Sequence, residues 1–180
     1  ALLGATGGLL GWDQETLLPP KSHPFRAEQS AQIAGMAHRL ATAPEVGDWL
    51  SACEDAGLPP AGPEAASIAR WRHDYNRATK IPSALVEESE RASGLARSVW
   101  ATARKDNHFA PFAPHLEKLL SYARQMADLW GYTQQPYDAL LEGYEPGWTT
   151  RQIETLFAQL QPRLMAIAQK AFAQIGRAHV

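Results

Sequence analysis

The stretch Pro111–Gly131, PFAPHLEKLLSYARQMADLWG, decides the fold class of this chain. Most of its apolar side chains recur at gaps of three or four residues, namely Phe112, Leu116, Leu119, Leu120, Ala123, Ala127 and Trp130. That spacing places them on one face of an α-helix. Gly131 follows where a helix end favours a residue with positive φ. The stretch therefore predicts an amphipathic helix that packs against other helices.

The same period recurs near the end of the chain, over residues 150–174. Its apolar positions are Ile153, Leu156, Phe157, Leu160, Leu164, Ile167 and Ala171. Thr149 and Gln152 stand three residues apart at its start and predict a capping box. The apolar face continues beyond Pro162, so we expect this proline to bend the helix and not to end it.

Further helices are predicted over residues 25–41, 64–79 and 82–105, with the last one starting at Pro82. Thr42 is expected to cap one more helix, which ends near Gly57. The glycine-rich start lacks a preceding strand and is interpreted as a loosely specified helix start. No segment alternates as a strand does. The sequence therefore predicts an all-α array of about eight helices without a division into two domains.

Composition limits the classes of partner. The net charge is −2, from 17 Lys and Arg against 19 Asp and Glu, so there is no basic excess for binding nucleic acid. No apolar stretch approaches the roughly 20 residues of a membrane span. Cys53 is the single cysteine, which excludes an intrachain disulfide and favours the cytoplasm.

The sequence contains no complete catalytic constellation. None of the 6 histidines belongs to an HExxH or Glu-x-x-His element, so no metal ligands are predicted. Gly-x-Ser-x-Gly and P-loop motifs are absent as well. We therefore predict no catalytic residue and no metal site in this chain.

Two short segments raise the question of binding. Trp12, Asp13 and Gln14 precede a double proline, and they form either a polar helix end or the wall of a binding site. In the structural alternative, Trp12 is buried and Asp13 or Gln14 binds a neighbouring helix. Tyr137 and Asp138 allow the same two interpretations, with a helix cap and a buried tyrosine as the structural one.

Several segments together resemble the N-terminal region of the carboxypeptidase Taq family of zinc-dependent metallocarboxypeptidases. They follow in the family's order and cover nearly the whole chain up to about residue 174. They are Leu10–Thr16 with Pro19-Pro20, Arg26–Gln29, Ile33–His38, Phe112–Lys118, Pro136–Leu141, Tyr144–Gly147 and Thr149-Thr150.

The resemblance implies a fold like that of neurolysin and angiotensin-converting enzyme, almost all helix, with two halves around a deep groove. Residues 1–174 are expected to be the N-terminal part of one larger peptidase domain. They would form one wall or lid of the groove, with Trp12, Asp13, Gln14, Tyr137 and Asp138 as candidate groove residues. The resemblance also implies peptide substrates, contact with the missing C-terminal half, and zinc in the full-length enzyme. It leaves room for a homodimer.

This fragment alone is expected to bind no zinc and to cleave nothing, because the HExxH metal site would lie beyond it. Residues 175–180 resemble the translation of a sequencing adapter, and we predict that they are a non-native tail. The alternative function is a stand-alone helical protein-interaction module without catalytic activity.

Overall fold

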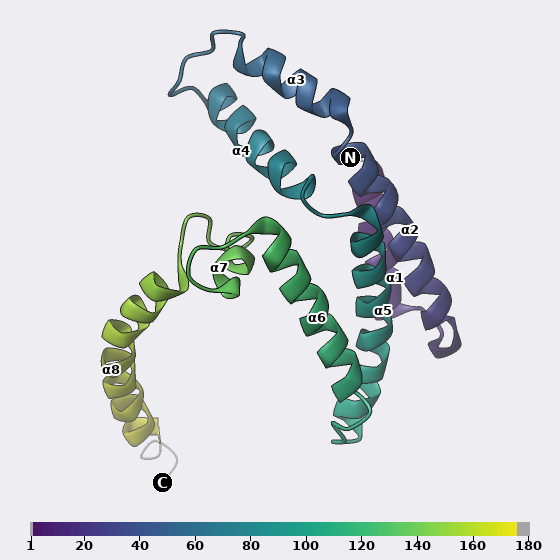
Figure 1. Ribbon diagram of the computed structural model, residues 1–180. Coiled ribbons are helices and arrows are strands. Elements are labelled where there is room, and N and C mark those ends of the chain that lie inside the picture. The colour runs from purple at the N-terminus through teal and green to yellow at the C-terminus, as the bar shows by residue number, and fades with distance from the viewer. Residues whose placement is uncertain (1, 176–180) are drawn as a thin grey trace. The chain divides into compact units, whose positions relative to one another are not determined.

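The computed structural model describes residues 2–175, and over that range every regular element is a helix (Figure 1). The elements are α1 (Leu2–Thr16), the 3-10 turn η1 (Pro20–Ser22), α2 (His23–Ala41), α3 (Pro44–Glu54), α4 (Pro63–Ala78), α5 (Ser83–Lys105), α6 (Ala113–Trp130), α7 (Pro136–Leu141) and α8 (Thr150–Ile175). The predicted all-α class of about eight helices is confirmed. The chain's internal contacts divide it into two compact units, residues 1–130 and 131–180.

Helix α2 is the centre of the first unit. It packs against both α1 and α5, and α5 also packs against α6 (Figure 1). The contact between α2 and α5 is made by small residues: Ala27 and Ala31 are 1% and 0% exposed. A Cβ atom added at Gly94 would lie 3.1 Å from the Cβ of Ala27. The two helices therefore approach closely because their facing side chains are small.

Helices α3 and α4 form a hairpin in the same unit. Thr42 does not cap α3, contrary to the sequence prediction. Its backbone N–H and its Oγ1 both donate to the carbonyl of His38, 2.9 and 2.8 Å away, so it ends α2 instead. The cap of α3 is Ala43, whose φ of −60° and ψ of 139° are extended. The reason is Pro44, because a proline disfavours helical geometry in the residue before it and is itself suited to the first helical position.

The C-terminal end of α6 is tied to the end of α4. The Trp130 indole N–H donates to the carbonyl of Arg77 at 3.2 Å, and Lys80 Nζ donates to the carbonyl of Trp130 at 2.8 Å. The guanidinium of Arg77 also lies 4.2 Å from the centre of the Trp130 ring. Gly131 then has a φ of +84°, as predicted for a helix end.

The second unit contains α7 and α8. The predicted capping box is confirmed: the Thr149 N–H donates to Gln152 Oε1 at 2.8 Å, and the Gln152 N–H points back at Thr149 Oγ1 at 3.4 Å. Helix α8 continues through Pro162, as the unbroken apolar face indicated. The predicted non-native tail, residues 175–180, lies outside the described residues except for the backbone of Ile175.

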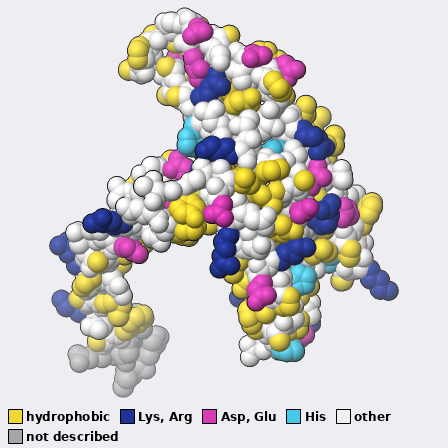
Figure 2. All heavy atoms as spheres, viewed as in Figure 1, with side chains coloured by type: hydrophobic (Ala, Val, Ile, Leu, Met, Phe, Trp, Pro, Cys, Tyr) yellow, Lys and Arg dark blue, Asp and Glu magenta, His cyan; other side chains and the backbone are white. Residues whose placement is uncertain are grey.

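Surface charge is mixed on the face shown in Figure 2, where Lys and Arg side chains are interspersed with Asp and Glu side chains. None of the described helices combines the length and the apolar character that crossing a bilayer requires.

Candidate functional site

Asp13 is bound to the neighbouring helix. Its Oδ2 accepts a hydrogen bond from Arg26 Nη2 at 2.6 Å, and the side chains of Arg26 and Asp13 are 12% and 32% exposed. Arg26 Nη1 donates to the carbonyl of Leu10 at 2.7 Å, and its Nε donates to Gln29 at 2.9 Å. One guanidinium thus joins the last turns of α1 to α2, which is the structural role that the sequence left open for Asp13.

Trp12 and Gln14 lie in different surroundings from Asp13. Trp12 is 56% exposed, so the expected burial of this indole is wrong. The reason is its position on α1: this helix buries no residue and contacts its unit mainly through α2. Gln14 lines two hollows in the surface of the first unit. Gln14 therefore borders a cavity, whereas Trp12 is exposed and free to contact another molecule.

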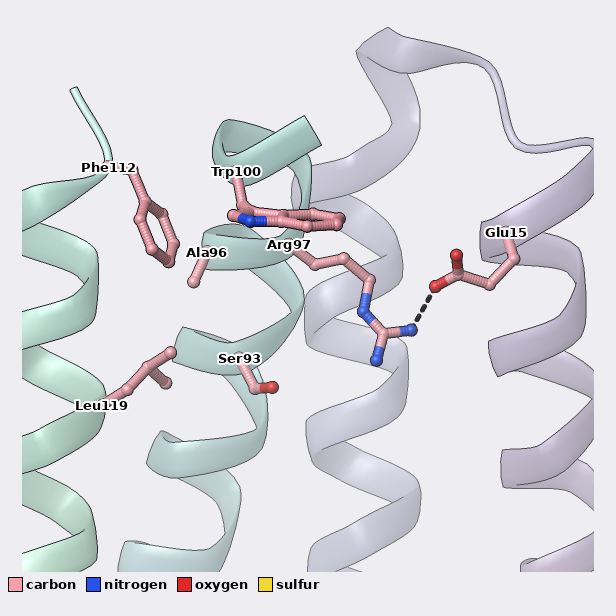
Figure 3. A pocket seen from close by; sticks show the side chains of 7 residues that line it. All are labelled: Glu15, Ser93, Ala96, Arg97, Trp100, Phe112 and Leu119. Carbon is pink, nitrogen blue, oxygen red and sulfur yellow. Dashed lines mark hydrogen bonds and ion pairs between the residues drawn. The ribbon is translucent and has the colours of Figure 1, made fainter. Parts of the chain in front are cut away.

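Glu15 extends to α5 and forms an ion pair with Arg97 (Figure 3). Asp13 and Glu15 are two positions apart on a helix, and such neighbours point in different directions. They accordingly bind different cations on different helices, Arg26 and Arg97. The two carboxylates therefore do not act as one pair.

A hollow of about 640 Å³ opens beside this ion pair. It is lined by Glu15, Ser93, Ala96, Arg97, Trp100, Phe112 and Leu119. Figure 3 shows Ala96 of α5 pointing toward Leu119 of α6 and toward Phe112, which directly precedes α6. The Trp100 ring lies over the Arg97 side chain, which extends toward Glu15. The hollow therefore combines an apolar wall with a charged edge, which is the combination found in sites that bind organic ligands.

A second hollow of about 680 Å³ shares Glu15 and Arg97 with the first hollow and is also lined by Gln14. Its lining also includes Asp106 and His108 from the end of α5 and the loop after it, and His23 at the start of α2. His23 Nδ1 is buried and has no hydrogen-bond partner among the described residues. The ion pair between Glu15 and Arg97 therefore borders both hollows.

No pattern in the sequence singles out Arg97 or Trp100. They are three positions apart and so lie on one side of the helix predicted for residues 82–105, but nothing in that spacing relates them to residue 15. Only the packing of α1 and α5 against the same helix, α2, brings Glu15 within reach of Arg97.

Asp138, in the second unit, caps the start of α8. Its Oδ1 accepts hydrogen bonds from the Thr150 Oγ1 at 2.6 Å and from the Thr150 N–H at 2.7 Å. These hydrogen bonds from Thr150 stabilise the carboxylate and lower the pKa of Asp138 below its usual value. The helix cap expected for Asp138 is present. Tyr137 is 57% exposed, so the expected buried tyrosine is wrong: the short helix α7 buries Ala139 and Leu141 instead.

The described residues offer no ligand set for the zinc ion that the resemblance implies. Within the described residues, no three His, Cys, Asp or Glu side chains gather closely enough to hold a metal ion. Zinc sites in enzymes use three protein ligands, so no chemical step through zinc can be derived from these side chains.

Comparison with known proteins identifies the family. The sequence profile of the carboxypeptidase Taq (M32) metallopeptidases matches residues 1–179. Thermostable carboxypeptidase 1 of Thermus thermophilus is 35% identical to this chain, covering 94% of the chain and 36% of the relative. Thermostable carboxypeptidase 1 of Pyrococcus furiosus is 31% identical, covering 93% of the chain and 34% of the relative.

A solved structure agrees with these sequence matches. The M32 carboxypeptidase of Deinococcus radiodurans R1 superimposes with a TM-score of 0.75 at 33% identity, over 95% of this chain and 34% of that protein. The chain thus spans about a third of the length of the relatives that it matches. By sequence and by fold, it belongs to the carboxypeptidase Taq (M32) metallopeptidase family.

Proposed function

We propose that this chain is the N-terminal part of a zinc-dependent metallocarboxypeptidase that releases C-terminal amino acids from peptides. The observation that carries the proposal is the family match over residues 1–179, combined with coverage of only 36% of the Thermus thermophilus relative. In this proposal, residues 1–174 are part of one larger peptidase domain in the cytoplasm. Zinc and its ligands belong to the part of the enzyme that this chain lacks.

The role of this chain is to form one wall of the peptide groove. The hollow beside Glu15 and Arg97 supports that role, because it offers Trp100 and Phe112 to an apolar side chain and a cation to a polar group. Gln14 borders the adjoining hollow, and exposed Trp12 lies two positions before it on α1. Asp13 keeps this wall in place through Arg26. Tyr137 and Asp138 are proposed as further groove residues on the second unit.

The isolated chain is proposed to bind no zinc in a stoichiometric amount and to cleave no peptide. Its partners in this proposal are peptide substrates, the C-terminal remainder of the enzyme and, in the assembled enzyme, a second copy. A stand-alone interaction module is the weaker alternative, since the relatives named above are carboxypeptidases.

A chimera tests this proposal. In this protein, called the Taq chimera below, the present chain replaces the aligned part of Thermus thermophilus thermostable carboxypeptidase 1. We expect the zinc-loaded Taq chimera to release C-terminal amino acids from a blocked dipeptide or a longer peptide, and the isolated chain to release none. A folded, zinc-loaded chimera without that activity would contradict the proposal, as would activity in the isolated chain.

A further inference from the structure

Helix α8 has no described partner for its apolar face. It is 26 residues long, and none of its described residues is buried. Five large side chains of its apolar stripe are well exposed: Leu156 48%, Phe157 57%, Leu160 38%, Leu164 52% and Ile167 64%. Figure 2 shows hydrophobic side chains on the surface of this helix. Most helical stability in proteins comes from packing an amphipathic face, so a helix of this kind requires a partner.

The stripe has the period of a helix-packing seam. Phe157, Leu160, Leu164, Ile167 and Ala171 follow one another at alternating gaps of three and four residues. That spacing is the heptad pattern by which one helix packs along another. Pro162 lies about 180° around the helix from the middle of the stripe, at 100° per residue. Its missing N–H and its ring are therefore kept away from the seam.

Charge further defines the partner. Arg163 and Lys170 are seven residues apart, so they follow the same edge of the stripe. Two cations along one edge of a seam favour a partner that carries Asp or Glu opposite them. The expected partner is thus helical, apolar along its centre and acidic along one border.

We propose that the apolar stripe of α8, from Leu156 to Ile167, is the docking surface for helices of the enzyme's C-terminal remainder. The proposal rests on the proposed function. Two facts support this occupant over a second copy of the chain. Relatives have about two thirds of their length outside the match, so a large part of the same enzyme is available to cover the stripe. In an antiparallel pair of copies, moreover, Arg163 and Lys170 of one copy would face the same cations of the other.

Amide hydrogen exchange in α8 tests the docking surface, measured in the isolated chain and in the Taq chimera. We expect the α8 amides to exchange at least about 100-fold more slowly in the chimera than in the isolated chain. Packing in the chimera protects the backbone amides of a helix that is otherwise exposed to water. In the chimera, Leu164→Glu should bring the exchange rates of the α8 amides to within about tenfold of those in the isolated chain, because it places a charge in the seam. Gln169→Glu, about 160° around the helix from Ile153, is the matched control and should change exchange by less than about twofold.

Three results would overturn the docking proposal. Equal exchange in the chimera and the isolated chain is the first, and equal effects of Leu164→Glu and Gln169→Glu are the second. The third is a dimer of the isolated chain, seen by analytical ultracentrifugation, that Leu164→Glu dissociates. If the isolated chain is a monomer and its α8 amides already exchange as slowly as in the chimera, the first result applies. The stripe would then pack against another part of the same chain.

A chimera that fails to fold leads to a second measurement. Only residues 150–175 are then grafted into the full-length Thermus thermophilus relative, and the same two substitutions are compared by thermal unfolding. A grafted protein that tolerates Leu164→Glu as well as Gln169→Glu contradicts the docking surface. The two proposals fail separately, because exchange and unfolding report the docking of α8 whereas peptide cleavage reports the proposed function.

Discussion

The guanidinium of Arg26 connects two helices through Asp13, with Nη2 and Oδ2 2.6 Å apart. The same group also donates to the carbonyl of Leu10 at 2.7 Å, near the end of α1. An aspartate that the sequence offers as a groove residue therefore also fixes the position of α1 against α2. Loss of this contact should disturb α1 before it disturbs the chemistry of any site.

Arg26→Met is expected to destabilise the isolated chain by about 1–3 kcal/mol, because it leaves a partly buried carboxylate and a carbonyl without a charged donor. Urea unfolding followed by circular dichroism measures this loss. Arg70→Met is the matched control, since it removes an exposed pair with Asp74 and should cost less than about 1 kcal/mol. Equal losses of unfolding free energy in Arg26→Met and Arg70→Met would show that Arg26 does not join α1 to α2.

Gly94→Leu should destabilise the first unit by about 1–3 kcal/mol or more, because α2 and α5 leave no room for the added atoms. A Cβ at Gly94 already lies 3.1 Å from Ala27, whereas one at Gly8 has no atom within 4 Å. Gly8→Leu is therefore the control, and it should be neutral or stabilising by up to about 1 kcal/mol. Thermal unfolding of Gly94→Leu and Gly8→Leu measures this difference in stability. A tolerated leucine at position 94 would contradict the close packing of α2 and α5.

Asp138→Asn should weaken the start of α8 in a pH-dependent way. The folded pKa of Asp138 is lowered by the hydrogen bonds from Thr150, so its contribution is complete above the unfolded pKa of about 3.9. It is lost as the pH falls through the lower, folded pKa. At neutral pH, the exchange rate of the Thr150 amide should rise severalfold in the variant.

Glu154→Gln provides the control for Asp138, because it removes a carboxylate from an exposed position of the same helix. It should leave the Thr150 amide unchanged. If wild-type and Asp138→Asn lose α8 helicity identically between pH 5 and pH 2, the capping role of the carboxylate is wrong.

Arg97→Gln separates groove function from stability. Both side chains of the ion pair are more than half exposed, 53% for Arg97 and 56% for Glu15, so its loss should change stability by less than about 1 kcal/mol. In the Taq chimera it should raise the KM for peptides at least about threefold, because a cation at the edge of the hollow is removed. Arg70→Gln, on α4, should leave both quantities unchanged. An unaltered KM in Arg97→Gln would remove Arg97 from the proposed groove.

Much of the fold could be predicted from the sequence because helices carry a local signal. The period of residues 111–130, the capping box at Thr149 and the turn at Gly131 all appear as predicted. The prediction that Thr42 caps α3 is wrong because a proline two positions later outweighs a hydroxyl as a helix start signal.

The candidate site was less accessible to the sequence because it depends on tertiary packing. Glu15 and Arg97 are 82 positions apart and meet across α2. The burial of Trp12 was overestimated, since a large indole is usually buried and no local pattern reveals which face of α1 lacks a partner. Asp138 could be placed at a helix cap, but its bond to Thr150 depends on how the loop after α7 turns back.

Peptide cleavage by the zinc-loaded Taq chimera, compared side by side with the isolated chain, is the measurement that decides whether this chain is the N-terminal part of a metallocarboxypeptidase. We expect the chimera to release C-terminal amino acids and the isolated chain to release none under the same conditions. A chimera that folds and holds zinc but releases no amino acid would contradict the claim that this chain is the N-terminal wall of a metallocarboxypeptidase.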